Sequence, residues 1–82
     1  MISNNNTISI TVKLFADLQE FGPAESIIDV PEGSTINYVM SKYKIPKEKK
    51  IIMLVNRLPR YDKNFVLNNN DTIAIFPPLA GG

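Results

Sequence analysis

The chain has 82 residues, of which 44% are hydrophobic and 21% are charged, and its net charge is +1. This predicts one globular domain with a small core, and the charge is too small to indicate a nucleic-acid partner. The absence of Cys and His excludes disulfides, thiolate nucleophiles, imidazole bases and zinc sites built from these residues. We therefore expect no metal site and no bound cofactor, and a protein that is not an enzyme by itself.

The first residues read as a polar lead. Residues 1–7 contain three consecutive asparagines and no basic segment followed by an apolar one, so they do not resemble a secretion signal. No apolar run approaches the length that spans a bilayer. We expect a disordered lead over residues 1–7, a folded domain over 8–76, a cytoplasmic location and no membrane partner.

Two strands are predicted in the first third of the chain. Apolar and polar side chains alternate over residues 8–14, the period of a half-buried strand. Residues 15–21 read as a connecting loop that permits a helical turn. Residues 26–30 are the second strand, which ends at Pro31-Glu32-Gly33. The two strands should pair as an antiparallel hairpin.

A short amphipathic helix follows. Ser34 is a good N-cap, and Pro46 ends the helix because proline disfavours helix at the preceding residue. A helix of about nine residues is marginal alone, so its apolar stripe must pack on a sheet. The stripe consists of Ile36, Val39, Met40 and Tyr43.

Lysines cluster between positions 42 and 50. Cations near a helix C-terminus interact favourably with the helix dipole. We interpret the cluster as a solvated helix end, and the alternative is a dedicated docking patch.

The second half begins with a continuous apolar run over residues 51–55, which predicts a strand buried on both faces. Asn56-Arg57 reads as a turn, and residues 58–61 as a short return strand. Pro59 cannot donate to a ladder, which indicates an edge strand.

The last strand predicted is at 72–76, after a strong turn signal at residues 68–71. The order of elements, β-β-α-β-β-β, predicts an α+β domain with one helix across a mixed sheet of about five strands. A plausible pairing brings the first and last strands together, parallel, at the centre. This is the β-grasp (ubiquitin-like) layout.

The sequence closes on a tail, residues 77–82, whose stiffness falls along its length. Pro77 and Pro78 each restrict φ, and Pro77 also favours an extended Phe76. Gly81 and Gly82 carry no side chain, so a terminal carboxylate on them can enter a narrow active site. In extended form the tail reaches about 20 Å. The alternative is a proline-rich strand stop followed by a frayed end.

The segment from Ile73 to Gly82, with its Phe-Pro-Pro-x-x-Gly-Gly ending, resembles the C-terminus of the MoaD/ThiS family of sulfur carriers, and within it the small subunit of molybdopterin synthase. Three further segments also match this family: the Asn-Asn-Asp turn, the Val55-Asn56 step and Leu14-Phe15-Ala16. The resemblance therefore covers about residues 8–82. Thiamine-pathway carriers share the diglycine but usually lack the paired prolines.

The resemblance implies a mechanism. An activating enzyme of the ubiquitin-activating type adenylates the Gly82 carboxylate with ATP, and a sulfur donor protein replaces the AMP to leave a thiocarboxylate. The tail, with Gly81 and Gly82 as its reacting end, then enters the large subunit of molybdopterin synthase. There it gives sulfur to a pyranopterin precursor and so forms the dithiolene of molybdopterin, the molybdenum-cofactor precursor.

The resemblance also implies a partner-docking surface. Phe15 and Phe76 could instead be ordinary core residues. Leu58, which lies beside Pro59 on an expected edge strand, is the better candidate for an interface residue. The full docking set is Phe15, Leu58, Phe76, Pro77, Pro78, Leu79 and Ala80.

Other functions remain open. The same adenylate could be captured by a target lysine, which would make the protein a ubiquitin-like modifier. Sulfur delivery to thiamine or to a tungsten cofactor is a further alternative, and so is a β-grasp interaction module whose tail is inert.

Overall fold

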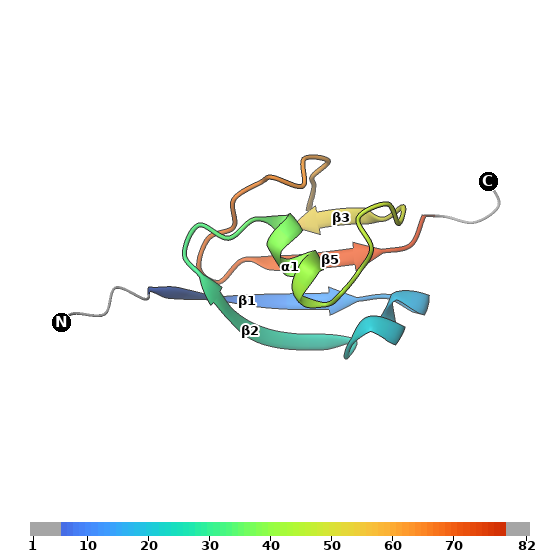
Figure 1. Ribbon diagram of the computed structural model, residues 1–82, viewed down its shortest axis with the longest axis horizontal. Helices are drawn as coiled ribbons and strands as arrows, with labels where there is room; N and C mark the ends of the chain where they lie inside the picture. The colour runs from blue at the N-terminus through green and yellow to red at the C-terminus, as the bar shows by residue number, and fades with distance from the viewer. Residues whose placement is uncertain (1–5, 79–82) are drawn as a thin grey trace.

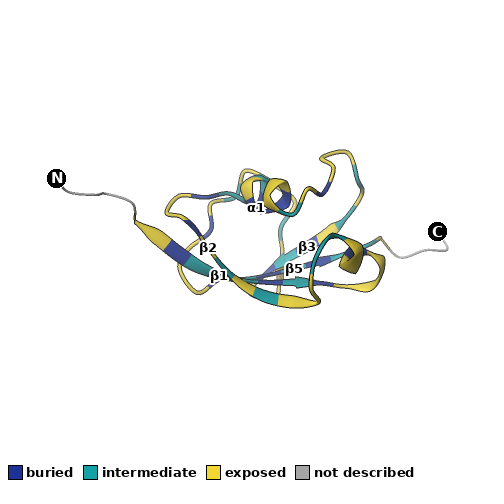
Figure 2. Ribbon diagram, turned by 60° about the horizontal axis from the view of Figure 1, so that its bottom comes forward, coloured by how far each residue is buried: buried dark blue, intermediate teal, exposed yellow. Residues whose placement is uncertain are grey.

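The computed structural model describes residues 6–78, which form a five-stranded mixed sheet with one α-helix across one face (Figures 1 and 2). The elements in chain order are β1 (Thr7–Leu14), the 3-10 helix η1 (Ala16–Phe21), β2 (Glu25–Pro31), α1 (Ile36–Lys42), β3 (Ile52–Val55), β4 (Leu58–Pro59) and β5 (Thr72–Phe76). This confirms the predicted β-β-α-β-β-β order and the α+β class.

The sheet order is β2-β1-β5-β3-β4, with the first and last strands adjacent at its centre. β1 and β5 run parallel, with Thr11 opposite Thr72 and Leu14 opposite Ile75. β1 pairs antiparallel with β2, and β3 pairs antiparallel with both β5 and β4. The predicted central parallel pair and the N-terminal hairpin are both confirmed, and the layout is a β-grasp.

The core lies between α1 and the face of the sheet that α1 covers (Figure 2). Alternation along β1 turns Ile10, Val12 and Leu14 toward this core, while the intervening side chains lie on the other face. The remaining buried apolar residues are Ile8, Leu18, Val30, Ile36, Val39, Met40, Ile45, Met53, Val55, Leu67, Ile73 and Ile75. The side of the sheet opposite α1, here called the open face, has no element packed on it within residues 6–78.

The helix starts one residue later than the predicted cap. Thr35, not Ser34, is the N-cap, and its Oγ1 accepts a hydrogen bond from the Tyr38 N–H. Ser34 is buried and its hydroxyl donates to the carbonyl of Pro31, so it closes the turn after β2 instead. The helix has 7 residues and ends at Lys42, so it is shorter than the expected nine and stops before Pro46. The hydroxyl of Tyr43, its C-cap, is 2.7 Å from that of Ser26 on β2.

Three further expectations need correction. β1 begins at Thr7, so the folded domain starts one residue before the expected boundary at 8. β3 is buried on one face only, because Ile52 and Leu54 lie on the open face. The return strand β4 stops at Pro59 instead of reaching position 61.

In the part of the chain that the structure describes, no helix has the length and apolar character needed to cross a membrane.

Candidate functional site

The tail leaves the fold from β5, the strand that pairs with both β1 and β3. Pro77, directly after Phe76, is half-buried, and Pro78 is exposed. Leu79, Ala80, Gly81 and Gly82, which include the predicted reacting residues, lie outside the described residues.

An aromatic pair lies at the base of the tail. The rings of Phe15 and Phe76 stack with centroids 4.2 Å apart and planes inclined by 11°. The Phe15 N–H also donates to the carbonyl of Ile75, at 3.1 Å. Phe15 is 36% exposed, so it is not a core residue, and its stacking on Phe76 holds its ring in place at the surface. The stack ties the η1 end of β1 to the last residue before the two prolines.

Ile52 extends this apolar surface onto β3. It lies opposite Phe76 in the β3–β5 ladder and is 41% exposed. Phe15, Phe76 and Ile52 together form what we call the exit platform, an apolar area from which the tail departs. An exposed apolar area beside a reactive segment is typical of a docking site.

A pocket of about 370 Å³ adjoins the exit platform on the open face. Its charged residues are two cations, Lys13 from β1 and Arg57 from the β3–β4 turn, and Phe15 belongs to both the pocket and the exit platform. The lining residues are Lys13, Phe15, Leu54, Asn56, Arg57, Thr72 and Ala74. The pocket thus offers apolar contact flanked by positive charge.

The β3–β4 turn is held against β5 by hydrogen bonds. The backbone N–H of Asn56 donates to the carbonyl of Thr72 at 2.8 Å, and the Thr72 N–H donates to the side-chain oxygen of Asn56 at 3.0 Å. The Asn56 amide in turn donates to Asp71, at 2.8 Å, and the second oxygen of Asp71 accepts from the Asn68 N–H. These bonds set the position of Arg57 at the pocket.

The structure brings Phe15 and Phe76 together but places Leu58 elsewhere. Leu58 lies on β4, and β3 separates it from β5. It is 56% exposed, as expected for an interface residue, yet it does not line the pocket. The docking role of all these residues stays a prediction.

Sequence reasoning missed seven residues of the exit platform and its pocket: Lys13, Ile52, Leu54, Asn56, Arg57, Thr72 and Ala74. The alternation over residues 8–14 does put Lys13 on the solvent face. Nothing local, however, reveals that Lys13 and Arg57 border one pocket, because they meet only through the β1–β5–β3 pairing. Among residues 6–78 no group of three or more acidic side chains is placed to hold a metal ion.

Comparison with solved structures supports the fold. The HVO 2177 protein of Haloferax volcanii superposes with a TM-score of 0.80 at 20% identity, covering 100% of this chain and 93% of that one. SAMP1, a small archaeal modifier protein of the same organism, gives 0.71 at 25% identity, with 90% and 99% covered. A chain from the complex of subunits 1 and 2 of the molybdopterin-converting factor of Helicobacter pylori gives 0.64 at 16% identity, with 92% and 100% covered.

No curated protein matches this chain. The model of the ThiS family, by contrast, matches residues 12–82, which include nearly all of the sheet, the exit platform and the tail. The chain therefore belongs to the ThiS family, as the resemblance predicted.

Proposed function

We propose that this protein is the sulfur-donating small subunit of a molybdopterin synthase, with Gly82 as the reacting residue. The observation that supports this best is the Phe-Pro-Pro-x-x-Gly-Gly segment, which leaves the fold from a central strand beside an apolar platform. The similarity to a chain of the two-component factor from Helicobacter pylori supports a heteromeric assembly. By itself the chain would not be an enzyme.

The chemistry follows from the poor reactivity of a carboxylate. Attack of the Gly82 carboxylate on the α-phosphorus of ATP, in a separate activating enzyme, forms an acyl-adenylate and releases pyrophosphate. The terminal sulfur of a persulfide on a donor protein then attacks the acyl carbon, and AMP leaves. A thiol reduces the resulting acyl disulfide by forming a disulfide with the donor's remaining sulfur, which frees the thiocarboxylate. The chain contains no Cys that could attack the adenylate. No bound cofactor is required, since the ATP is used by the activating enzyme.

Within this proposal the open face is the docking surface. The exit platform supplies apolar contact close to the tail, and Lys13 and Arg57 supply positive charge at the pocket. A partner that covers this face also receives the tail in a set direction, because β5 and the two prolines limit the directions it can take. The activating enzyme and the large subunit would use this face in turn.

The first experiment is intact mass spectrometry of the full chain after incubation with a candidate activating enzyme, ATP and a sulfur donor. We expect a gain equal to the replacement of one oxygen by sulfur, mapped to Gly82. Deletion of Gly82, or one residue added after it, should abolish the gain and leave the thermal unfolding midpoint unchanged.

The matched control is Glu32→Ala, which should acquire sulfur normally. Glu32 is exposed, and its N–H donates to the carbonyl of Asn6 just before β1, whereas Phe15 follows the other end of that strand. The large synthase subunit and the pyranopterin precursor are then added to the sulfur-loaded chain. Dithiolene formation supports the molybdopterin pathway. Loading without transfer would exclude this pathway and point to thiamine or tungsten-cofactor synthesis.

The similarity to SAMP1 favours a second candidate, a ubiquitin-like protein modifier. Both candidates share the adenylate at Gly82, but here a target lysine attacks it and forms an isopeptide bond. After digestion with trypsin, lysates of cells that make the protein should then contain peptides whose lysines bear residues 64–82 of this chain, because Lys63 is its last Lys or Arg. These peptides should be absent when Gly82 is deleted, and a lysate without them would argue against a modifier.

A further inference from the structure

Charge is strongly segregated along this chain. Eight of the nine Lys and Arg residues lie between positions 42 and 63, together with only two carboxylates, Glu48 and Asp62. Residues 17–32 contain five carboxylates and no cation. The net charge of +1 therefore conceals a basic half and an acidic half. The proposed function uses only two of the nine cations, Lys13 and Arg57.

The basic half has a pocket of its own, on the side of the sheet opposite the open face. It measures about 490 Å³ and lies on the outer surface of α1, whose inner surface is buried in the core. Its lining is entirely polar or aromatic, and its charged members are two lysines. The lining residues are Thr35, Asn37, Tyr38, Ser41, Lys42 and Lys47.

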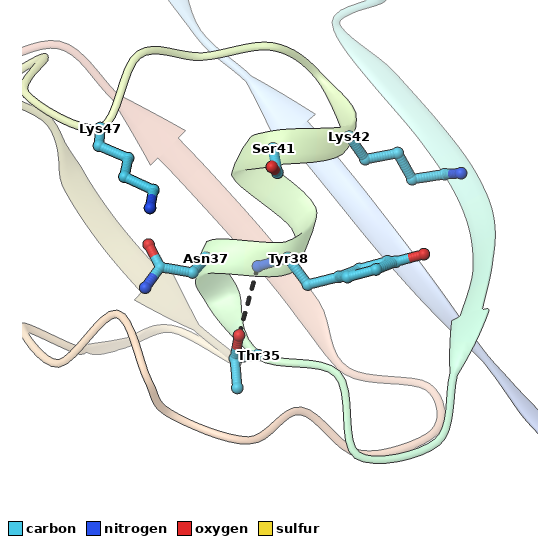
Figure 3. Close-up of a pocket in the computed structure, with 6 residues that line it drawn as sticks. All are labelled: Thr35, Asn37, Tyr38, Ser41, Lys42 and Lys47. Carbon is cyan, nitrogen blue, oxygen red and sulfur yellow. Dashed lines mark hydrogen bonds between the residues drawn. The ribbon is translucent and has the colours of Figure 1, made fainter.

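The lining side chains come from two segments, α1 with its N-cap and the loop after it. Figure 3 shows Lys47, on the loop after α1, extending toward Asn37, while Tyr38 and Lys42 project from the helix beside each other. Tyr38 and Lys42 are four residues apart, the spacing of neighbours on a helix surface. Lys47 thus lies near the Asn37 amide on one side of the helix, and Lys42 lies beside Tyr38 on the other side.

A third lysine is held close to the pocket. The Lys63 Nζ donates to the carbonyl of Lys47, at 3.0 Å, and the carbonyl of Lys63 accepts from the Asn37 N–H, at 2.9 Å. The nearby carboxylates do not line the pocket. Asp62 is engaged locally, because its Oδ1 accepts from the Asn64 N–H at 2.9 Å. We call Lys42, Lys47 and Lys63 the helix-side cationic cluster.

We propose that the helix-side cationic cluster is a second docking surface, which binds an acidic segment of a partner protein. Carboxylates of such a segment would pair with the three ammonium groups and accept hydrogen bonds from the Ser41 and Tyr38 hydroxyls. An extended polyanion such as duplex DNA fits less well, since it would also meet the acidic half, whose Glu25, Asp29 and Glu32 are exposed.

The position of the cluster gives it a distinct use. The open face lies on the far side of the sheet from α1, so a partner on the cluster leaves that face and its pocket accessible (Figure 2). A third protein could therefore hold the carrier while another protein occupies the open face. This goes beyond the proposed function and does not depend on Gly82.

The test is NMR titration of the full chain with an end-blocked, Glu-rich peptide, with the same peptide carrying Gln for Glu as the control probe. We expect saturable shifts of the amides of Tyr38, Ser41 and Lys47, lost at high ionic strength and absent with the Gln peptide. The triple variant Lys42→Gln, Lys47→Gln, Lys63→Gln should weaken binding about tenfold, as several exposed ion pairs acting together would.

The matched control removes the same charge elsewhere in the basic half, with Lys44→Gln, Lys49→Gln and Lys50→Gln, and should change the affinity by less than about twofold. Dispersed amide spectra for both variants establish that both are folded. Equal weakening by the two variants, or shifts spread over all lysines, would overturn the proposal. Tighter binding of a DNA duplex than of the peptide would also overturn it, and so would self-association through this surface in sedimentation.

Discussion

The aromatic pair of Phe15 and Phe76 links the base of the tail to the body of the protein. Phe15 and Phe76 are 61 positions apart in sequence, yet their rings stack at 4.2 Å. Offset or stacked aromatic pairs contribute about 0.5–1.5 kcal/mol beyond the area they bury. Part of that energy restrains Phe76, and through it the direction in which Pro77 and Pro78 leave.

We predict that Phe15→Leu and Phe76→Leu are coupled. A double-mutant cycle on the free energy of unfolding, measured in urea, should give an interaction energy of about 1 kcal/mol. Phe15→Leu should also slow thiocarboxylate formation at Gly82, whereas Phe15→Tyr, which keeps the stack, should react normally. Additive unfolding energies for the two changes would mean that the stack does not restrain Phe76.

A second prediction at this scale concerns Asp71, a buried carboxylate that accepts from the Asn56 amide and the Asn68 N–H. Asp71→Ala leaves both donors without an acceptor, so the free energy of unfolding should fall by about 2–3 kcal/mol. Asp62→Ala is the control, because that carboxylate is exposed and accepts one local bond. Asp62→Ala should lower the free energy of unfolding by less than about 1 kcal/mol. Equal losses would show that burial of the Asp71 network adds nothing.

The β3–β4 hairpin is built on a strained turn. Val55 and Leu58 are paired, so the loop has two residues, and both have positive φ: 51° at Asn56 and 74° at Arg57. This is the type I′ turn, whose second position favours glycine because other residues incur a steric cost there. An arginine at this position, with its side chain at the pocket of the open face, is what the proposed docking role would retain at a cost in local stability.

We therefore predict that Arg57→Gly raises the free energy of unfolding by about 1 kcal/mol and weakens binding of the activating enzyme. Arg57→Ala is the matched variant, since it removes the same charge and keeps the strain. It should weaken binding equally without stabilising the fold. The measurements are urea unfolding and calorimetric titration, and a less stable Arg57→Gly variant would contradict the strain argument.

The helix and strands could be predicted from the sequence more accurately than the residues at which they begin and end. Alternation over residues 8–14 was sufficient for β1, because one face of that strand is buried and the other is not. The cap of α1 was ambiguous because Ser34 and Thr35 are both good N-cap residues, and only the contact of Ser34 with Pro31 decides between them. A four-residue apolar strand such as β3 has the same sequence pattern whether one or both of its faces are buried. The exposure of Ile52 could therefore be known only from the fold.

For the whole molecule, the parts of the candidate site that are contiguous in sequence could be predicted, and the parts that join distant segments could not. The tail is contiguous, so its prolines and glycines were readable directly. The pocket on the open face joins Lys13, Arg57 and Ala74, which come from three separated segments. Their proximity depends on strand register, and local pattern does not specify register between distant strands.

Truncation of the chain should also separate the residues needed for folding from those needed for sulfur loading. The core cluster lies within residues 8–75, so a chain ended at Pro78 should unfold within about 0.5 kcal/mol of the full chain and accept no sulfur. A chain ended at Ala74 loses Ile75, a fully buried side chain worth about 2–5 kcal/mol, together with its pairing to β1 and β3. It should be largely unfolded by circular dichroism. If the chain ended at Pro78 also unfolds, the tail has a structural role.

The parallel pairing of β1 and β5 also determines how the protein responds to tension. Under the proposed function, a partner that releases the tail slowly would pull on Pro78 along the axis of β5, which lies between two neighbouring strands (Figure 1). The ladder hydrogen bonds lie across that axis, so a pull loads them together in shear instead of opening them one by one. The protein should therefore resist mechanical unfolding from its tail end, as the proposed cycles of tail insertion and withdrawal would require.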